Sequence, residues 1–145
     1  LSQALLPGGF SPIAIADSSS PLATLRTVEQ GGAVSYTQAI RVPDSRPLSQ
    51  ILASTGTLAA TSANISGQPS AVSAQQAAAA LGLSVDLYLD AGPTPGPVAS
   101  TVVQADPQAP DGIDILREGV IPAALIHKLL AQHSQQSQSS DHFEK

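Results

Sequence analysis

The sequence contains no cysteine, no methionine and no tryptophan, and aromatic residues make up only 3% of it. Without cysteine, disulfide bonds and thiolate metal sites are excluded. With so few aromatic rings, a core must be built from Ala, Val, Leu and Ile. No apolar run approaches the roughly 18 residues that suggest a membrane span, and no signal peptide pattern is visible. These absences predict a cytoplasmic protein with no membrane partner.

Basic residues are also scarce. Six lysines and arginines face 11 aspartates and glutamates, which gives a formal net charge of −5 over 145 residues. Proteins that mainly grip a nucleic-acid backbone usually carry a basic surface, so this balance opposes general RNA binding and leaves room for a small phosphate site. Because the chain begins at Leu1 and lacks methionine, we expect either a piece of a longer protein or a non-standard start.

Apolar periodicity predicts alternating strands and helices, which favours an α/β layered domain. Val34, Tyr36, Gln38 and Ile40 alternate with smaller or polar residues, as is typical of a strand. The predicted strands cover residues 11–16, 33–42, 57–61, 85–90, 100–104 and 113–117. One helix is predicted to end near residue 6, and a second to cover 22–29 up to a break at Gly31 and Gly32. Three further helices are predicted: over 47–55, from a cap at Ser70 or Ser73 to Gly82, and from Pro122 to about 132. We predict one domain over 1–132 and a disordered polar tail over 133–145.

Most familiar catalytic patterns are missing. The three histidines, His127, His133 and His142, all lie in the last helix or the tail, and none has the spacing of a nucleophilic triad. We expect His127 to be a solvated helix residue. Asp86 and Asp90 are both expected to face solvent. No glycine-rich phosphate loop or dinucleotide fingerprint is present.

The segment "TSANISGQPS", Thr61–Ser70, is the strongest local signal. It joins a predicted strand to a predicted helix through small polar residues, and backbone N–H groups at such a junction can bind an anion. Ser62, Ser66 and Ser70 add hydroxyl donors, and Asn64 offers both a donor and an acceptor. The alternative is an ordinary turn, since Ser, Asn and Gly are common there.

Three further positions have two interpretations each. Arg41 is either a surface charge or a clamp for an anion. Ser100 either begins a strand or presents its hydroxyl at the rim of a pocket. Arg117 either binds a ligand or forms a salt bridge with Glu118 or Asp114.

Four short segments follow one another along the chain: "RVP" at 41–43, "TSANISGQPS" at 61–70, "STVV" at 100–103 and "ILREG" at 115–119. In this order they resemble the threonylcarbamoyl-adenylate synthases of the YrdC-like family. "LLPGGF" at 5–10 is similar to an altered form of the family's Leu-Pro-Gly-Pro segment. The resemblance covers about 5–132, and it implies a twisted mixed sheet with flanking helices and a concave cleft.

The resemblance implies a nucleotidyltransferase reaction. L-threonine, bicarbonate and ATP give threonylcarbamoyl-adenylate and pyrophosphate, for the threonylcarbamoyladenosine modification of tRNA through tRNA-modifying partner proteins. Mg²⁺ is expected on the triphosphate. A weak contact with double-stranded RNA is also implied. The nucleophiles are the threonine amine and the carbamate, so no catalytic side chain is assigned.

The resemblance also assigns binding roles, position by position. The residues expected to bind ATP are Thr37, Ser62, Asn64, Ser70 and Arg117. Those expected to bind threonine are Arg41, Ala60 and Ser100.

The sequence departs from the family pattern in two places. The family's N-terminal Lys-x-Arg motif is not found, and the two lysines, Lys128 and Lys145, lie near the C-terminus. The Pro-Gly-Pro-x-Thr pattern is altered over Pro7–Ser11. We therefore expect the C-terminal two-thirds of a synthase, with an exposed sheet edge and exposed apolar surface. The alternative is an inactive member that binds nucleotide or RNA or serves as an assembly module.

Overall fold

The computed structural model of the chain describes residues 1–22, 24–30 and 33–140. These residues form two compact units. One unit, the sheet unit, contains Leu1–Asp44 and the chain from Ala99 onward. The other, the helical unit, contains Ser45–Val98. The predicted domain over 1–132 includes both.

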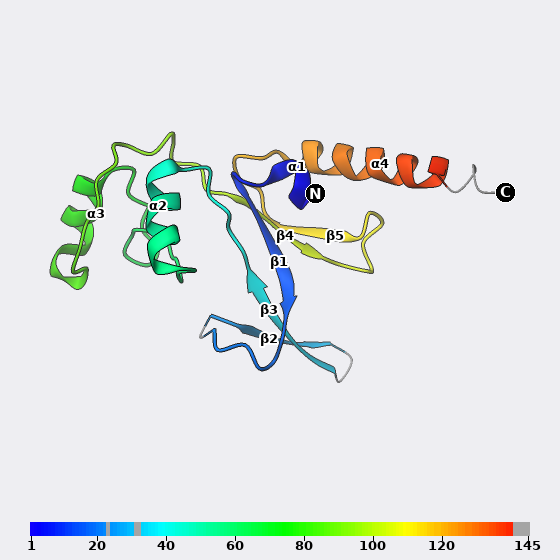
Figure 1. Ribbon diagram of the computed structural model, residues 1–145, viewed down its shortest axis with the longest axis horizontal. Helices are drawn as coiled ribbons and strands as arrows, with labels where there is room; N and C mark the ends of the chain where they lie inside the picture. The colour runs from blue at the N-terminus through cyan, green and yellow to red at the C-terminus, as the bar shows by residue number, and fades with distance from the viewer. Residues whose placement is uncertain (23, 31–32, 141–145) are drawn as a thin grey trace. The chain divides into compact units, whose positions relative to one another are not determined.

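The sheet unit is built around five strands (Figure 1). Their order in the sheet is β2-β3-β1-β4-β5, with β1 and β4 parallel and the other neighbours antiparallel. The predicted α/β class with a mixed sheet is therefore confirmed. The strand bounds are β1 Phe10–Ala16, β2 Arg26–Gln30, β3 Ala33–Ala39, β4 Thr101–Ala105 and β5 Ile113–Arg117.

Two helices supply the apolar side chains that cover this sheet. Helix α1 (Ser2–Leu5) and helix α4 (Ala123–Ser140) lie near β4 and β5 (Figure 1). The core that they complete contains Phe10, Val103 and Ile126, each at most 4% exposed. Partly buried leucines and isoleucines surround it. Full burial of an apolar side chain of this size stabilises the fold by about 1.5–3 kcal/mol. Phe10 is the one aromatic residue among the three buried core residues.

Strand register separates the two faces of the sheet. Phe10 pairs with Thr101, and Val103 pairs with Pro12 and Ile115, so these residues share the face that α4 covers. Because successive side chains alternate between faces, their neighbours lie on the opposite side, which we call the second face. The second face carries Ser11, Ile13, Ile15, Thr37, Ala39, Val102, Gln104 and Asp114. An irregularity in the register between Val102 and Val103 interrupts the alternation on β5, so that Arg117 pairs with Val102 although it lies two residues after Ile115.

The helical unit contains α2 (Arg46–Thr55), α3 (Ala74–Leu81) and the 3₁₀ turn η1 (Gly82–Ser84). At the start of α3, the Ser73 hydroxyl accepts the N–H of Gln76. The Gln76 side chain in turn accepts the N–H of Val72. The arrangement differs from a capping box only in that Gln76 accepts from the residue before the cap, and Ser73 rather than Ser70 begins the helix. The predicted ends at Gly56 and Gly82 are confirmed.

Three predicted elements are wrong. Residues 22–29 do not form a helix, because 26–30 pair with β3 as strand β2 and the ladder outweighs local helix propensity. The predicted break at Gly31 and Gly32, like Ala23, lies outside the described residues. Strands at 57–61 and 85–90 do not form, since the described residues between Ser45 and Val98 contain no strand with which they could pair.

The end of the chain also differs from expectation. Helix α4 continues to Ser140, so residues 133–140 of the predicted disordered tail are helical, while 141–145 lie outside the described residues. Within the described range, no helix is both long and apolar enough to cross a membrane.

Exposed apolar side chains are present, as the sequence led us to expect. Ile15 on the second face is 83% exposed. In the helical unit, Leu83, Leu87 and Leu89 are 102%, 69% and 64% exposed.

The core makes a direct prediction for stability. Truncation of Ile126, which is fully buried, leaves a cavity that its tightly packed neighbours cannot fill. Ile126→Ala should lower the free energy of unfolding by about 2–5 kcal/mol, as measured by urea titration. Leu125→Ala on the same helix, where the side chain is 42% exposed, is the matched control and should change it far less. Equal effects of the two substitutions would contradict this account of the core.

Candidate functional site

A buried hydroxyl fixes the geometry at the start of β4. Thr101 is fully buried, and its Oγ1 donates to the carbonyl of Ile121 at 2.6 Å. The same oxygen accepts the N–H groups of Gly119 and Ile121 at 2.9 and 3.1 Å. One side chain thus uses its whole hydrogen-bonding capacity to hold the segment after β5 against the beginning of β4.

Glycine is required for this close approach. A Cβ at Gly119 would lie 2.2 Å from the carbonyl oxygen of Ala99 and 2.5 Å from the carbonyl carbon of Ser100. Both neighbours are backbone atoms, which cannot rotate away. The absence of a side chain at this position therefore lets the end of β5 lie directly beside Ser100.

Arg117, at the end of β5, is bound along one edge by Ser100. Its Nε and Nη2 donate to the carbonyl of Ser100 at 3.1 and 2.9 Å, and Nη2 also reaches the Ser100 hydroxyl at 3.3 Å. The structure thus brings together two residues predicted for the site. Of the salt-bridge partners suggested by the sequence, the Glu118 carboxylate accepts the N–H of Ala123 and the Asp114 carboxylate accepts from Gln104.

The remaining predicted residues of the sheet unit share the same face. Thr37 pairs with Ile15 on the second face. Beyond the end of β3, the N–H of Ile40 still donates to the carbonyl of Pro12 at 2.9 Å, which continues the register by one residue. Alternation then puts Arg41 on the second face next to Ser11. By alternation Thr37 and Arg41 lie on the second face, while Arg117 and Ser100 are joined by their hydrogen bonds.

Ser11 joins this group, although the sequence assigned it no role. Its hydroxyl donates to that of Ser100 at 2.8 Å, and both side chains are buried. The sequence did contain a clue to Ser11, because it lies in the altered Pro7–Ser11 segment at the position where the family pattern has a threonine. A hydroxyl is retained at that position, whereas the proline two residues earlier is replaced by Gly9.

The other predicted residues lie in one loop of the helical unit. Gln68 donates its N–H to the carbonyl of Ile65, and Gly67 has a φ of 81°, as the third residue of a type II turn requires. The Asn64 side chain donates to the carbonyl of Ile65 at 2.9 Å and accepts from the Ser70 hydroxyl at 3.4 Å. Ala60 and Ser62 precede this turn and are exposed.

These loop contacts agree with both interpretations of the segment. Asn64 stabilises the turn from within, as the ordinary-turn alternative requires. Its carboxamide nevertheless retains one N–H and one lone pair, because the side chain has two donors and two acceptor sites. The binding roles of Asn64, Ser70, Ser62 and Ala60 stay predictions.

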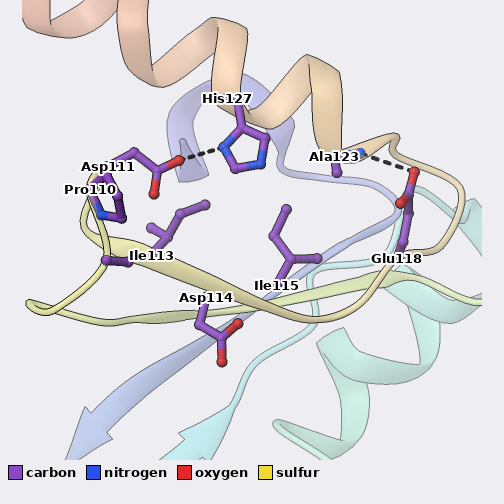
Figure 2. A pocket seen from close by; sticks show the side chains of 9 residues that line it. Pro110, Asp111, Ile113, Asp114, Ile115, Glu118, Ala123 and His127 are labelled. Carbon is purple, nitrogen blue, oxygen red and sulfur yellow. Dashed lines mark hydrogen bonds and ion pairs between the residues drawn. The ribbon is translucent and has the colours of Figure 1, made fainter.

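A separate pocket of 440 Å³ lies between β5 and α4, and no predicted site residue lines it. Figure 2 shows Ile113 and Ile115 directed toward α4, with Asp111 and Glu118 at either side, while Asp114 points away. The Nδ1 of His127 is hydrogen-bonded to the Asp111 carboxylate. The His127 side chain is 51% exposed, which agrees with the expectation of a solvated residue. That expectation did not include its hydrogen bond to Asp111, which lies 16 positions away in the sequence.

No metal centre accompanies these groups. In the part of the chain that the structure describes, histidine, aspartate and glutamate do not gather in any group of three or more that could hold an ion. The polar groups around Ser100 are instead the guanidinium group of Arg117, which can only donate hydrogen bonds, and hydroxyls, which can donate and accept them.

The mixed five-stranded sheet with its helices defines an α/β protein, and comparison identifies the family. Residues 1–119 match the model of the Sua5–YciO–YrdC family, which is described as telomere recombination. The chain belongs to this family.

Relatives and solved structures agree with that assignment. A protein of Mycobacterium leprae (strain TN), provisionally named threonylcarbamoyl-AMP synthase, is 40% identical over 91 residues, which cover 63% of this chain and 40% of that protein. A Mycobacterium tuberculosis (strain ATCC 25618 / H37Rv) protein with the same provisional name is 37% identical over 91 residues, or 63% of this chain and 41% of that protein. The crystal structure of P. abyssi Sua5 complexed with L-threonine matches with a TM-score of 0.71 and 29% identity, over 88% of this chain and 35% of that one.

The chain thus spans about two fifths of the length of the curated relatives that it matches.

The glycine beside Ser100 generates the first prediction for the site. Gly119→Ala should lower the free energy of unfolding by about 1–3 kcal/mol or more, because the new methyl group overlaps backbone atoms. Gly96→Ala is the matched control, since a Cβ there meets nothing within 4 Å. Urea unfolding of both variants provides the measurement, and a Gly119→Ala protein as stable as wild type would show that Ser100 can move aside.

The pair between Asp111 and His127 predicts a dependence of stability on pH. The hydrogen bond from His127 lowers the pKa of the Asp111 carboxyl, and the charge of His127 acts in the same direction. Because this pKa is lower in the folded state than in the unfolded chain, the pair stabilises the fold at pH values above the unfolded pKa, about 3.9. That contribution is lost as the pH falls through the folded pKa.

We therefore expect Asp111→Asn to be less stable than wild type near pH 6 and to approach it as the pH falls through the lowered folded pKa of Asp111, in urea titrations over the acidic range. A stability difference that stays constant with pH would argue against the pair.

Proposed function

We propose that this chain carries a large part of the substrate-binding surface of a threonylcarbamoyl-AMP synthase. Such an enzyme condenses L-threonine, bicarbonate and ATP to threonylcarbamoyl-adenylate and pyrophosphate. Support comes from membership in the family, from the provisional names of the Mycobacterium relatives and from the L-threonine bound to the similar P. abyssi protein. The product would serve the modification of an adenosine in tRNA, through partner proteins.

The observation that carries the proposal is the set of hydrogen bonds between Arg117 and Ser100, two residues predicted for the site. Arg41, another of the six basic residues, follows β3 on the face that strand alternation assigns to Ser11 and Thr37. The reaction joins a carboxylate, a bicarbonate and a triphosphate, whose negative charges repel one another. Guanidinium groups counter that repulsion and bind carboxylate and phosphate oxygens with defined geometry.

Within this proposal the residues divide by substrate. Threonine would be bound by Arg41, Ser100 and the backbone at Ala60. The residues proposed to bind ATP are Thr37, Ser62, Asn64, Ser70 and Arg117. Asn64 suits such a role because half of its hydrogen-bonding capacity is unused within the turn.

The proposed chemistry requires no nucleophile from the protein. The threonine amine attacks the carbon of bicarbonate, and loss of water leaves a carbamate. A carbamate oxygen then attacks the α-phosphorus of ATP, and pyrophosphate departs. The protein contributes by holding these groups in line and by stabilising negative charge. Magnesium would enter with the triphosphate.

The second candidate function is that of a binding or assembly module rather than an enzyme. Lys128 and Lys145 are the only lysines, so this sequence does not contain the family's N-terminal Lys-x-Arg motif. That observation favours a module that binds nucleotide or RNA, or assists assembly, without catalysis. Binding would then persist and turnover would be absent.

Calorimetric titration of the 145-residue chain with magnesium and ATP, with and without L-threonine, tests the binding surface. We expect saturable binding of both ligands, and Asn64→Ala should weaken ATP binding about tenfold, since a hydrogen bond to a charged group contributes about 1.5–3 kcal/mol. Gln68→Ala, an exposed side chain in the same turn, is the matched control and should leave the affinity unchanged. An unaltered dissociation constant for Asn64→Ala would remove that residue from the site.

Release of pyrophosphate from ATP, threonine and bicarbonate then separates the two functions. The chain alone should turn over slowly, because it contributes no Lys-x-Arg motif. Failure to bind either ATP or threonine would end the synthase proposal, and binding without any pyrophosphate would favour the non-catalytic module.

A further inference from the structure

Arg26 has a defined place in the sheet, although it belongs to none of the sequence motifs. It begins β2, the strand at one edge, and pairs with Thr37 of β3. Thr37 pairs in turn with Ile15 of β1. Directly opposed residues of neighbouring strands point to the same face. Arg26, Thr37 and Ile15 therefore form one row across the second face of the sheet.

The register of this row is regular. Neither ladder contains a shift like the one between β4 and β5. The next residue of β2, Thr27, pairs with Tyr36 and so points to the opposite face. Because the Cβ atoms of a cross-strand pair lie about 4.5–5.5 Å apart, Arg26 can contact a ligand that lies on Thr37.

The guanidinium group of Arg26 is available for such a ligand. The residue is exposed, and no hydrogen bond or ion pair holds its side chain among the residues that the structure describes. Ile15 in the same row is 83% exposed, so the described residues leave this part of the face open. The N–H groups of the guanidinium can therefore bind an anion, and their planar arrangement matches carboxylate and phosphate oxygens.

Position along the sheet relates Arg26 to the nucleotide rather than to threonine. The proposed function assigns Thr37 to ATP and Arg41 to threonine. Arg41 follows Thr37 by four residues, which is about 14 Å along an extended chain, against about 5 Å for a cross-strand pair. Of the residues proposed to bind ATP, only Arg117 carries a charge, whereas a triphosphate carries several. A further cation beside Thr37 fits that excess of negative charge.

We propose that Arg26 is a further nucleotide-binding residue, whose guanidinium group binds a phosphate of the nucleotide beside Thr37. The identity of that nucleotide as ATP rests on the proposed function. The contact gives this chain a cation for the triphosphate, although its sequence contains no Lys-x-Arg motif. The alternative role of Arg26 is that of a charge which keeps other strands from pairing with the edge strand β2.

Calorimetric titration of the 145-residue chain with three probes tests the phosphate contact. The probes are ATP with magnesium, inorganic tripolyphosphate with magnesium, and adenosine. We expect Arg26→Ala to weaken binding of ATP and of tripolyphosphate about tenfold, the size of one hydrogen bond to a charged group, and to leave adenosine binding unchanged. Arg46→Ala, which removes the same charge from an exposed arginine of α2, is the matched control and should leave all three affinities unchanged.

An exchange of two neighbouring residues separates the phosphate contact from the edge-charge alternative. Arg26→Thr combined with Thr27→Arg keeps the net charge and the strand, but it moves the guanidinium to the opposite face. The exchanged chain should lose the same tenfold in ATP affinity as Arg26→Ala. Thermal unfolding followed by circular dichroism establishes that each variant is folded. Arg26→Gln, which keeps a long polar side chain, gives the same test if either of the others does not fold.

The inference is overturned if folded Arg26→Ala or Arg26→Gln binds ATP like wild type, if the exchanged chain keeps wild-type affinity, or if Arg26→Ala weakens adenosine as much as ATP. It is also overturned if the chain binds neither ATP nor tripolyphosphate. These results are distinct from failure of the proposed function. Phosphate binding that depends on Arg26 without pyrophosphate formation would refute the synthase and leave the inference standing. Pyrophosphate formation that is indifferent to Arg26 would do the reverse.

Discussion

The buried hydroxyl of Thr101 is the contact on which the rest of the sheet unit depends. It holds the segment after β5 at Gly119 and Ile121, and that segment leads directly into α4. On one side of the sheet, this positions Ile126 against Phe10 and Val103 in the core. On the other side, it places the end of β5 beside Ser100. Stability and recognition therefore share one hydrogen-bonded junction, which has no room for a side chain at position 119.

The charge balance defines what the proposed anion-binding surface requires of the fold. Because the formal net charge is −5, such a surface needs arginines that the fold brings together. Strand alternation puts Arg41 on the second face, and the carbonyl of Ser100 accepts two hydrogen bonds from Arg117. The hydroxyls of Ser11 and Ser100 are hydrogen-bonded to each other beside Arg117.

Local patterns predicted the elements whose partners lie nearby or whose ends are marked. Alternation identified β3, and the capping serine and the final glycine identified α3. The patterns failed where the outcome depended on distant pairing. Residues 26–30 became a strand because β3 offered a ladder, and residues 85–90 kept a strand-like alternation without becoming one, since a strand requires a neighbour as well as a pattern.

By itself, the sequence determined the family and the α/β class, because ordered motifs and periodicity are properties of the chain. Only the tertiary structure decided how distant residues meet. Ser11 and Ser100 are separated by 89 positions, and nothing local predicts that their hydroxyls lie 2.8 Å apart. The parallel pairing of β1 with β4 brings them together, and Arg117 at the end of β5 is hydrogen-bonded to Ser100 as well.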